Sequence, residues 1–324
     1  MNAHSIPIID VAPLRSSDRA AARRTADALC SAATDVGFFY IDNHGIPQHE
    51  IDTAFSLARQ FFHATPEEKH EVAISANHRG WLEIGAARMY GSAQPDLKES
   101  FVWGLDVDEN DEDYRAGDRL LAPNRWPAFL PGMREILVRY FQAAQDCGEN
   151  LLRAFALGLD IPQDYFVKSF DKPISRGTLI WYPPRKATKE LASLGSSAHT
   201  DYGMLTLLCQ DDVGGLQVRQ SNGAWLDVPP ISGTLVVNIG DLLARWSNGR
   251  FESTPHRVIR SDDRERYSMA MFVDPNWDAV LQPATIPGER ARYEPVLCAD
   301  YITARFNEAF AYRDSGRADD AGET

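Results

Sequence analysis

The sequence comprises 324 residues, 44% of them hydrophobic, and carries a formal net charge of −13 at pH 7. A chain of this length can bury a large core, and its acidic surplus argues against nucleic acid as a partner. No secretory signal is visible, and no apolar run approaches the ~20 residues that span a bilayer, so we expect a cytoplasmic protein without membrane attachment. The four cysteines are too scattered for a disulfide framework or a thiolate zinc site: Cys30, Cys147, Cys209 and Cys298.

The first part of the chain, residues 5–125, combines helices with short strands. Hydrophobic periodicity, capping residues and glycines mark the ends of these elements. The expected elements are a strand over 6–11, a helix from the cap at Ser16-Ser17-Asp18 to about Asp35, a strand over 37–41 and a helix over 47–62. Residues 76–125 are rich in Gly, Asp and Asn, and we expect irregular structure there, interrupted by the apolar piece at 101–104.

A long supporting helix is expected within residues 126–160, because apolar residues recur there at three- and four-residue spacing. The sequence pattern then changes to short β-rich runs, separated by turn signals, within a core spanning 176–280. These runs are 177–181, 204–209, 216–219, 225–228, 234–238, 256–259 and 267–273. Such spacing predicts an antiparallel barrel or jelly roll. A C-terminal helix within 297–313 and a disordered tail, 314–324, complete what we expect to be a single unit.

The main chemical signal is a pair of possible metal ligands beside a buried strand. His199 and Asp201 are two residues apart, so extended backbone would turn both toward one face. His256 stands at the head of another predicted strand and offers a third ligand. Two histidines and one carboxylate, with coordination positions left open, form the facial triad of non-haem Fe(II) oxygenases.

A second signal is Arg266-x-Ser268 at the start of the last predicted strand, where both side chains share a face. The turn near Asp262-Asp263 predicts that this strand forms a hairpin with 256–259. A guanidinium with a neighbouring hydroxyl is a suitable anchor for the distal carboxylate of a dicarboxylic acid.

These residues, together with several longer stretches, carry a resemblance. The pattern His199-x-Asp201, His256 and Arg266-x-Ser268 is joined by further matching segments at 37–46, 96–101, 210–218 and 237–249. From about residue 5 to residue 312 the chain is identified as a member of the isopenicillin N synthase-like family of Fe(II)/2-oxoglutarate-dependent oxygenases.

The resemblance implies an α+β fold, in which a double-stranded β-helix (a jelly-roll, cupin-like core) is flanked by helices and the helical N-terminal half packs on the barrel. It implies Fe(2+) held by His199, Asp201 and His256, and 2-oxoglutarate held by Arg266 and Ser268, with Tyr182 nearby. O2 would then oxidise a small organic substrate by hydroxylation or desaturation, with release of succinate and CO2. Candidate substrate-lining residues are Arg88, Trp103 and Phe272, and Asp274 and the C-terminal helix would also surround the substrate.

Three alternatives remain open at this point. An oxidase of the isopenicillin N synthase type would keep the arginine and serine without using 2-oxoglutarate. A zinc hydrolase could use the same three ligands, but it would leave Arg266 and Ser268 without a role. A metal-stabilised binding protein without turnover is the third. The sequence specifies neither the substrate, since similar scaffolds serve many reactions, nor the oligomeric state.

Overall fold

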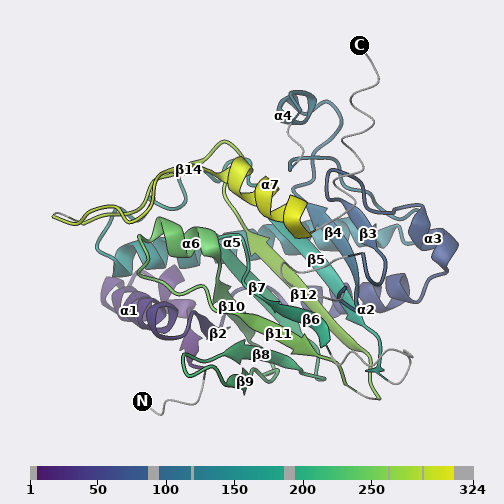
Figure 1. The fold of residues 1–324 in the computed structure, drawn as a ribbon, viewed down its shortest axis with the longest axis horizontal. Helices are drawn as coiled ribbons and strands as arrows, with labels where there is room; N and C mark the ends of the chain where they lie inside the picture. The colour runs from purple at the N-terminus through teal and green to yellow at the C-terminus, as the bar shows by residue number, and fades with distance from the viewer. Residues whose placement is uncertain are drawn as a thin grey trace.

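Eight strands form the main sheet, which is mixed and mostly antiparallel. The computed structural model (Figure 1) describes residues 6–86, 95–117, 120–185, 194–261, 263–286 and 288–309. In spatial order the strands are β1 (Ile8–Asp10), β2 (Phe38–Asp42), β10 (Leu235–Ile239), β7 (Leu205–Gln210), β12 (Arg266–Val273), β5 (Arg176–Tyr182), β4 (Glu99–Gly104) and β3 (Gly80–Leu82). Only the pairing of β1 with β2 is parallel among these neighbours.

A second, four-stranded sheet faces the inner side of the main sheet. Its order is β6 (Leu194–His199), β11 (His256–Ile259), β8 (Leu216–Arg219) and β9 (Trp225–Asp227). A small apolar cluster between the sheets joins strands of both, including Tyr40 and Val236 on one side and Val218 and Val258 on the other. Two sheets closed around an interior form a jelly roll, as the sequence predicted. A separate two-stranded sheet pairs β13 (Val280–Leu281) with β14 (Val296–Leu297).

The two faces of the main sheet have different partners because strand side chains alternate. Along β12, Arg266, Ser268, Ala270 and Phe272 line the interior of the jelly roll. The alternate residues Tyr267, Met269, Met271 and Val273 belong to the large core on the opposite face. Three helices cover that outer face: α1 (Arg19–Asp35), α2 (Gln48–Phe62) and α5 (Gly132–Gly158).

The helix ends follow the sequence signals closely. Asp18 caps α1 by accepting hydrogen bonds from the amides of Ala20 and Ala21, and α5 is the long helix that the periodicity predicts. Thr65 and Glu68 form a capping box at α3. The shorter helices are η1 (Ala12–Arg15), α3 (Pro66–His70), α4 (Glu112–Arg115) and α6 (Asp241–Trp246), and α7 (Cys298–Ala309) is the C-terminal helix. Within the described residues, none of the helices combines the length and hydrophobicity needed to cross a bilayer.

The structure corrects three expectations. The predicted hairpin is wrong, because β11 pairs with β6 and β8 whereas β12 pairs with β5 and β7 in the other sheet. Strand β6 was not expected, and the stretch 76–125, expected to be irregular, contributes β3 and β4 to the main sheet. The predicted tail at 314–324 lies outside the described residues.

Candidate active site

A cavity of about 150 Å³ lies between the two sheets. Strand β12 runs along it, with Arg266 at one end and Phe272, six residues further on, at the other. This separation corresponds to about 20 Å of extended chain. The cavity therefore has two ends, and the three predicted metal ligands line the same cavity.

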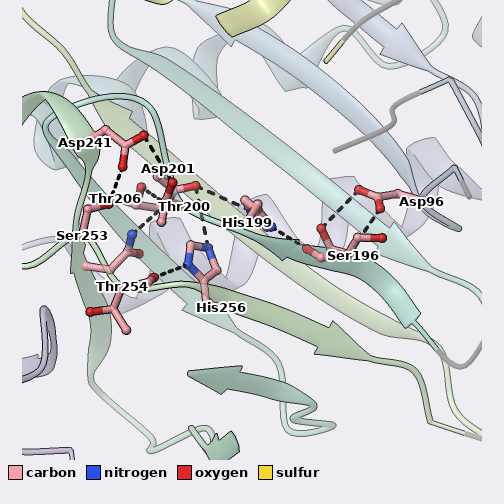
Figure 2. Close-up of polar contacts among 12 residues, drawn as sticks. Asp96, Ser196, His199, Thr200, Asp201, Thr206, Asp241, Ser253, Thr254 and His256 are labelled. Carbon is pink, nitrogen blue, oxygen red and sulfur yellow. Dashed lines mark hydrogen bonds and ion pairs between the residues drawn. The ribbon is translucent and has the colours of Figure 1, made fainter. Parts of the chain in front are cut away.

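The three predicted metal ligands come together from two neighbouring strands and one loop. His199 ends β6, His256 begins β11, and their Cα atoms are partners in the ladder, so the two imidazole rings stand 4.4 Å apart. Asp201 follows in the loop, with its Oδ1 atom 3.7 Å from Nε2 of each histidine. One ligand atom from each residue lies within 4.8 Å of the others (Figure 2), which is a spacing that one metal ion can bridge.

The hydrogen bonds around the triad engage Nδ1 of each histidine and Oδ2 of the aspartate, so the other nitrogen and oxygen atoms are available to a metal. His199 Nδ1 is 2.7 Å from the carbonyl oxygen of Ser197, and His256 Nδ1 is 3.2 Å from that of Thr254. A carbonyl oxygen can only accept, so each Nδ1 carries a proton, and a neutral imidazole held in this way presents the lone pair of Nε2 to a metal. The Oδ2 atom of Asp201 accepts hydrogen bonds from Thr206 at 2.5 Å and from Asn238 at 2.7 Å, which leaves Oδ1 for the ion.

The charge states also suit metal binding. Burial, reinforced by the neighbouring His256, lowers the pKa of His199 to about 4, so its imidazole is neutral at pH 7. Burial alone would raise the pKa of Asp201, but the two histidines and the hydrogen bonds from Asn238 and Thr206 together lower it. Two neutral imidazoles and one carboxylate are the donor set of a non-haem Fe(II) site.

Two further aspartates hold the backbone that carries these ligands (Figure 2). Asp96 accepts from the Ser197 amide at 3.0 Å and from the Ser196 hydroxyl at 3.2 Å, just before His199. Asp241 accepts from Thr200 at 3.2 Å and from Ser253 at 2.6 Å, so it ties the segment between two ligands to the segment before the third. Arg305 of α7 reaches Asp241 as well, at 2.9 Å.

At one end of the cavity, Arg266 is a buried cation, with 1% of its surface exposed. Its Nε donates to the Gly214 carbonyl at 2.7 Å, and its two terminal nitrogens donate to Ser268 and to Gln210 at 3.2 and 3.0 Å. Its guanidinium carbon lies 4.9 Å from the centre of the Tyr182 ring. No carboxylate pairs with it in the described part of the chain, so an anion is needed there to balance its charge.

The sequence-based substrate residues have separate outcomes. Phe272 lines the cavity at the end opposite Arg266. Trp103 does not: its ring is fully buried on the helix side of the sheet, and its Nε1 donates to the Leu137 carbonyl of α5 at 3.2 Å. The alternation along β4 turns its neighbours Ser100 and Val102 inward instead, so Trp103 is a core residue. Arg88 lies outside the described residues.

Two cavity residues were missed at the sequence level. Arg176 and Lys98 line the cavity, and each has a buried carboxylate partner, Asp274 and Asp96, at 3.0 Å. Burial raises the pKa of Asp274, although Arg176 opposes this shift. The signal for Arg176 was present, since it is six residues before Tyr182 and therefore shares its strand face. Lys98 lies in the matching segment 96–101, but nothing in the sequence alone assigned it to the cavity.

Comparison with known proteins gives a consistent result. Residues 169–275 match the family model of the 2OG-Fe(II) oxygenase superfamily, and residues 6–129 match the model named non-haem dioxygenase in morphine synthesis N-terminal. The chain is 32% identical to the 2-oxoglutarate-Fe(II) type oxidoreductase hxnY of Emericella nidulans, over 94% of this chain and 90% of that protein. It is 34% identical to a homoarginine-6-hydroxylase of Arabidopsis thaliana, over 95% of this chain and 98% of that protein.

Solved structures agree with these relatives. A full-length Neurospora crassa protein in complex with alpha-KG and thymine superimposes with a TM-score of 0.82 at 30% identity, covering 94% of this chain and 97% of the other. Relatives and structural neighbours of this kind confirm the expected fold, the iron and 2-oxoglutarate requirement and the enzymatic class. The same relatives exclude the zinc hydrolase alternative for the triad. The chain belongs to the 2OG-Fe(II) oxygenase superfamily.

Proposed function

We propose that His199, Asp201 and His256 bind Fe(II), and that Arg266 and Ser268 bind the 5-carboxylate of 2-oxoglutarate in the same cavity. The observation that carries this assignment is the buried guanidinium of Arg266, which has no carboxylate partner among the described residues and lines the same cavity as the triad. A dicarboxylic acid that reaches from the ion to Arg266 would supply the missing charge.

In this arrangement each residue has a defined task. The carbonyls of Ser197 and Thr254 keep the two imidazoles in the ligating tautomer, and Thr206 and Asn238 orient the Asp201 carboxylate. Tyr182 covers one face of the Arg266 guanidinium and so keeps water from it. When bound, Fe(II) and 2-oxoglutarate supply the oxidising chemistry with O2, in which 2-oxoglutarate is converted to succinate and CO2 and the substrate is oxidised.

We further propose hydroxylation of a small organic molecule as the reaction, with desaturation as the second outcome. The relatives include a protein named for hydroxylation of homoarginine, and a structural neighbour was crystallised with thymine. The oxidase that does not use 2-oxoglutarate is less well supported, because relatives such as hxnY are named 2-oxoglutarate-Fe(II) type oxidoreductases. We also propose a cytoplasmic location, which the four free thiols of the structure support.

The test is a screen of small molecules for stimulated succinate release by the protein supplied with Fe(II), 2-oxoglutarate and O2. We expect a subset of compounds to raise succinate formation stoichiometrically with an oxidised product. The Asp201→Ala variant, which lacks one ligand, is the control and should release no substrate-dependent succinate. Product formation by the wild-type protein in the absence of 2-oxoglutarate would refute the proposal in favour of the oxidase.

A further inference from the structure

A second arginine stands at the cavity end opposite Arg266. Arg176 begins β5 and is the ladder partner of Phe272 in β12, whereas Arg266 is the partner of Tyr182 at the other end of the same strand pair. If 2-oxoglutarate lies between Arg266 and the metal ligands, as proposed above, the space between those ligands and Arg176 is left for the primary substrate.

Two aromatic rings lie close to the Arg176 guanidinium. Its central carbon lies 4.9 Å from the Phe272 ring centre and 4.6 Å from that of Phe306, which α7 contributes. Nη1 donates to Asp274 Oδ2 at 3.0 Å, and in the described part of the chain neither Nη2 nor Nε makes a hydrogen bond. The free donors therefore lie in the guanidinium plane, where they can meet an acceptor on a bound molecule.

The partner of Arg176 is a buried carboxylate. Asp274 is completely buried, and its Oδ1 accepts from the Met204 amide at 3.0 Å while its Oδ2 accepts from Arg176. Both oxygens therefore accept a hydrogen bond, and although burial raises the pKa of Asp274, the Arg176 guanidinium beside it opposes this shift and favours the charged form. Arg176 therefore has a carboxylate as its ion-pair partner, whereas Arg266 has none among the described residues.

Among the described residues, the cations that line the cavity and the carboxylates that line it or pair with those cations are equal in number. The described cations that line it are Lys98, Arg176 and Arg266, and the described carboxylates at or directly behind its wall are Asp96, Asp201 and Asp274. Fe(II) and the 2-oxoglutarate dianion would add equal and opposite charge. An anionic substrate would then leave an uncompensated buried charge, which is costly, whereas a neutral one would not.

We propose that the primary substrate is a neutral molecule with a flat, unsaturated ring, and that a carbonyl or equivalent acceptor on it hydrogen-bonds to the edge of Arg176. Aromatic side chains surround this end, since Tyr202 and Phe306 also line the cavity, 6.5 Å apart between ring centres. Flat rings pack against such side chains with more contact than saturated rings do. The assignment rests on the proposed function, because it takes the Arg266 end to be occupied by 2-oxoglutarate.

The test uses three probes that differ in one property each: benzamide, benzoate and cyclohexanecarboxamide. Benzoate adds a negative charge to the benzamide shape, and cyclohexanecarboxamide keeps the amide but loses the flat ring. Binding is measured by calorimetric titration of the anaerobic protein loaded with Fe(II) and 2-oxoglutarate. We expect benzamide to bind at least about tenfold more tightly than either of the other probes, which is the effect of one charge-assisted hydrogen bond or one ring contact.

Matched variants connect this preference to the proposed residues. Arg176→Lys keeps the positive charge beside Asp274 but loses the planar edge, and we expect it to weaken benzamide binding at least about tenfold. Arg134→Lys is the control, because Arg134 is an exposed residue that pairs with Asp106 at 2.9 Å and does not line the cavity. It should bind all three probes as the wild type does. Thermal unfolding of each variant verifies that it is folded.

Several results would overturn the inference. These are tighter binding of benzoate, equal binding of cyclohexanecarboxamide, no binding of any probe, or an unchanged benzamide affinity in folded Arg176→Lys. The charge-transfer absorption of Fe(II)-bound 2-oxoglutarate is recorded on the same samples. If that absorption is absent from the wild type, the proposed function fails as well; if it is present while the probe ranking is wrong, only the substrate class is refuted.

Discussion

Replacing Arg266 by glutamine tests the 2-oxoglutarate site most directly. The substitution removes the only buried guanidinium at that end of the cavity among the described residues, while it retains a side chain that can hydrogen-bond. Losing a charge-assisted, two-pronged contact with a buried carboxylate costs about 2–4 kcal/mol. This corresponds to a loss of roughly 30- to 700-fold in 2-oxoglutarate affinity at 1.4 kcal/mol per tenfold.

A graded comparison comes from Ser268, whose hydroxyl lies 3.2 Å from an Arg266 nitrogen and is neutral. Ser268→Ala removes one neutral hydrogen bond, worth about 0.5–1.5 kcal/mol, so we expect a loss of only about 2- to 12-fold. Iron affinity should be unchanged in both variants, because neither residue is among the three metal ligands.

The assay is titration of the anaerobic Fe(II) protein with 2-oxoglutarate, followed by the charge-transfer absorption of the chelated keto acid. Calorimetric titration provides an independent dissociation constant. Thermal unfolding must accompany both, since Arg266 also donates to the Gly214 carbonyl and its loss leaves that acceptor unpaired. Equal 2-oxoglutarate affinity in folded Arg266→Gln and wild-type protein would remove Arg266 from its proposed role while leaving the iron site intact.

Three further predictions concern the metal and the core. His199→Ala or His256→Ala should remove the iron, because two remaining ligands hold a labile ion poorly; stoichiometric iron by elemental analysis in both variants would contradict the ligand assignment. Asp241→Asn should weaken iron binding by about 10- to 100-fold in a chelator competition. Asp241 is not a ligand, but it holds the segments on both sides of the site through Thr200 and Ser253. An unchanged iron affinity would show that these segments keep their positions without the Asp241 carboxylate. Trp103→Ala should lower the free energy of unfolding, measured by denaturant titration, by about 3–5 kcal/mol. The KM of an identified substrate should not change. A raised KM would show that Trp103 contacts the substrate after all.

The fold was largely predictable because most strands of the jelly roll contain a short apolar run bounded by turn residues. Strands β8 and β11 were predicted with the bounds that they have in the structure. Strand β6 was not, because Leu194–His199 consists mainly of glycine, serine and alanine and gives no alternation. The pairing of β11 with strands of one sheet and β12 with strands of the other depends on long-range closure, so the short connection between them was misread as a hairpin.

Site residues that lie close together in the sequence were predictable. Site residues whose position depends on the register between strands were less so. His199 and Asp201, or Arg266 and Ser268, are separated by one residue, and that spacing alone places each pair on one side. Trp103 was misassigned because the register of β4 decides which of two adjacent residues faces the cavity, and no local feature specifies it. Asp274 was expected only to surround the substrate, and its pairing with Arg176 requires β5 and β12 to be neighbours.

Strand β12 accounts for the order of the whole cavity. Its inward face presents Arg266, Ser268, Ala270 and Phe272 in sequence, so a cation, a hydroxyl, a small side chain and an aromatic ring follow one another at intervals of about 7 Å. The small side chain of Ala270 leaves room in the middle of the row, between the cation and the ring. A one-residue shift of β12 would turn Arg266 toward the helices and leave a charge in the apolar core, where no anion could reach it. The same alternation that packs Met269 and Met271 against α5 therefore also fixes which end of the cavity is available to a dicarboxylic acid and which to a substrate.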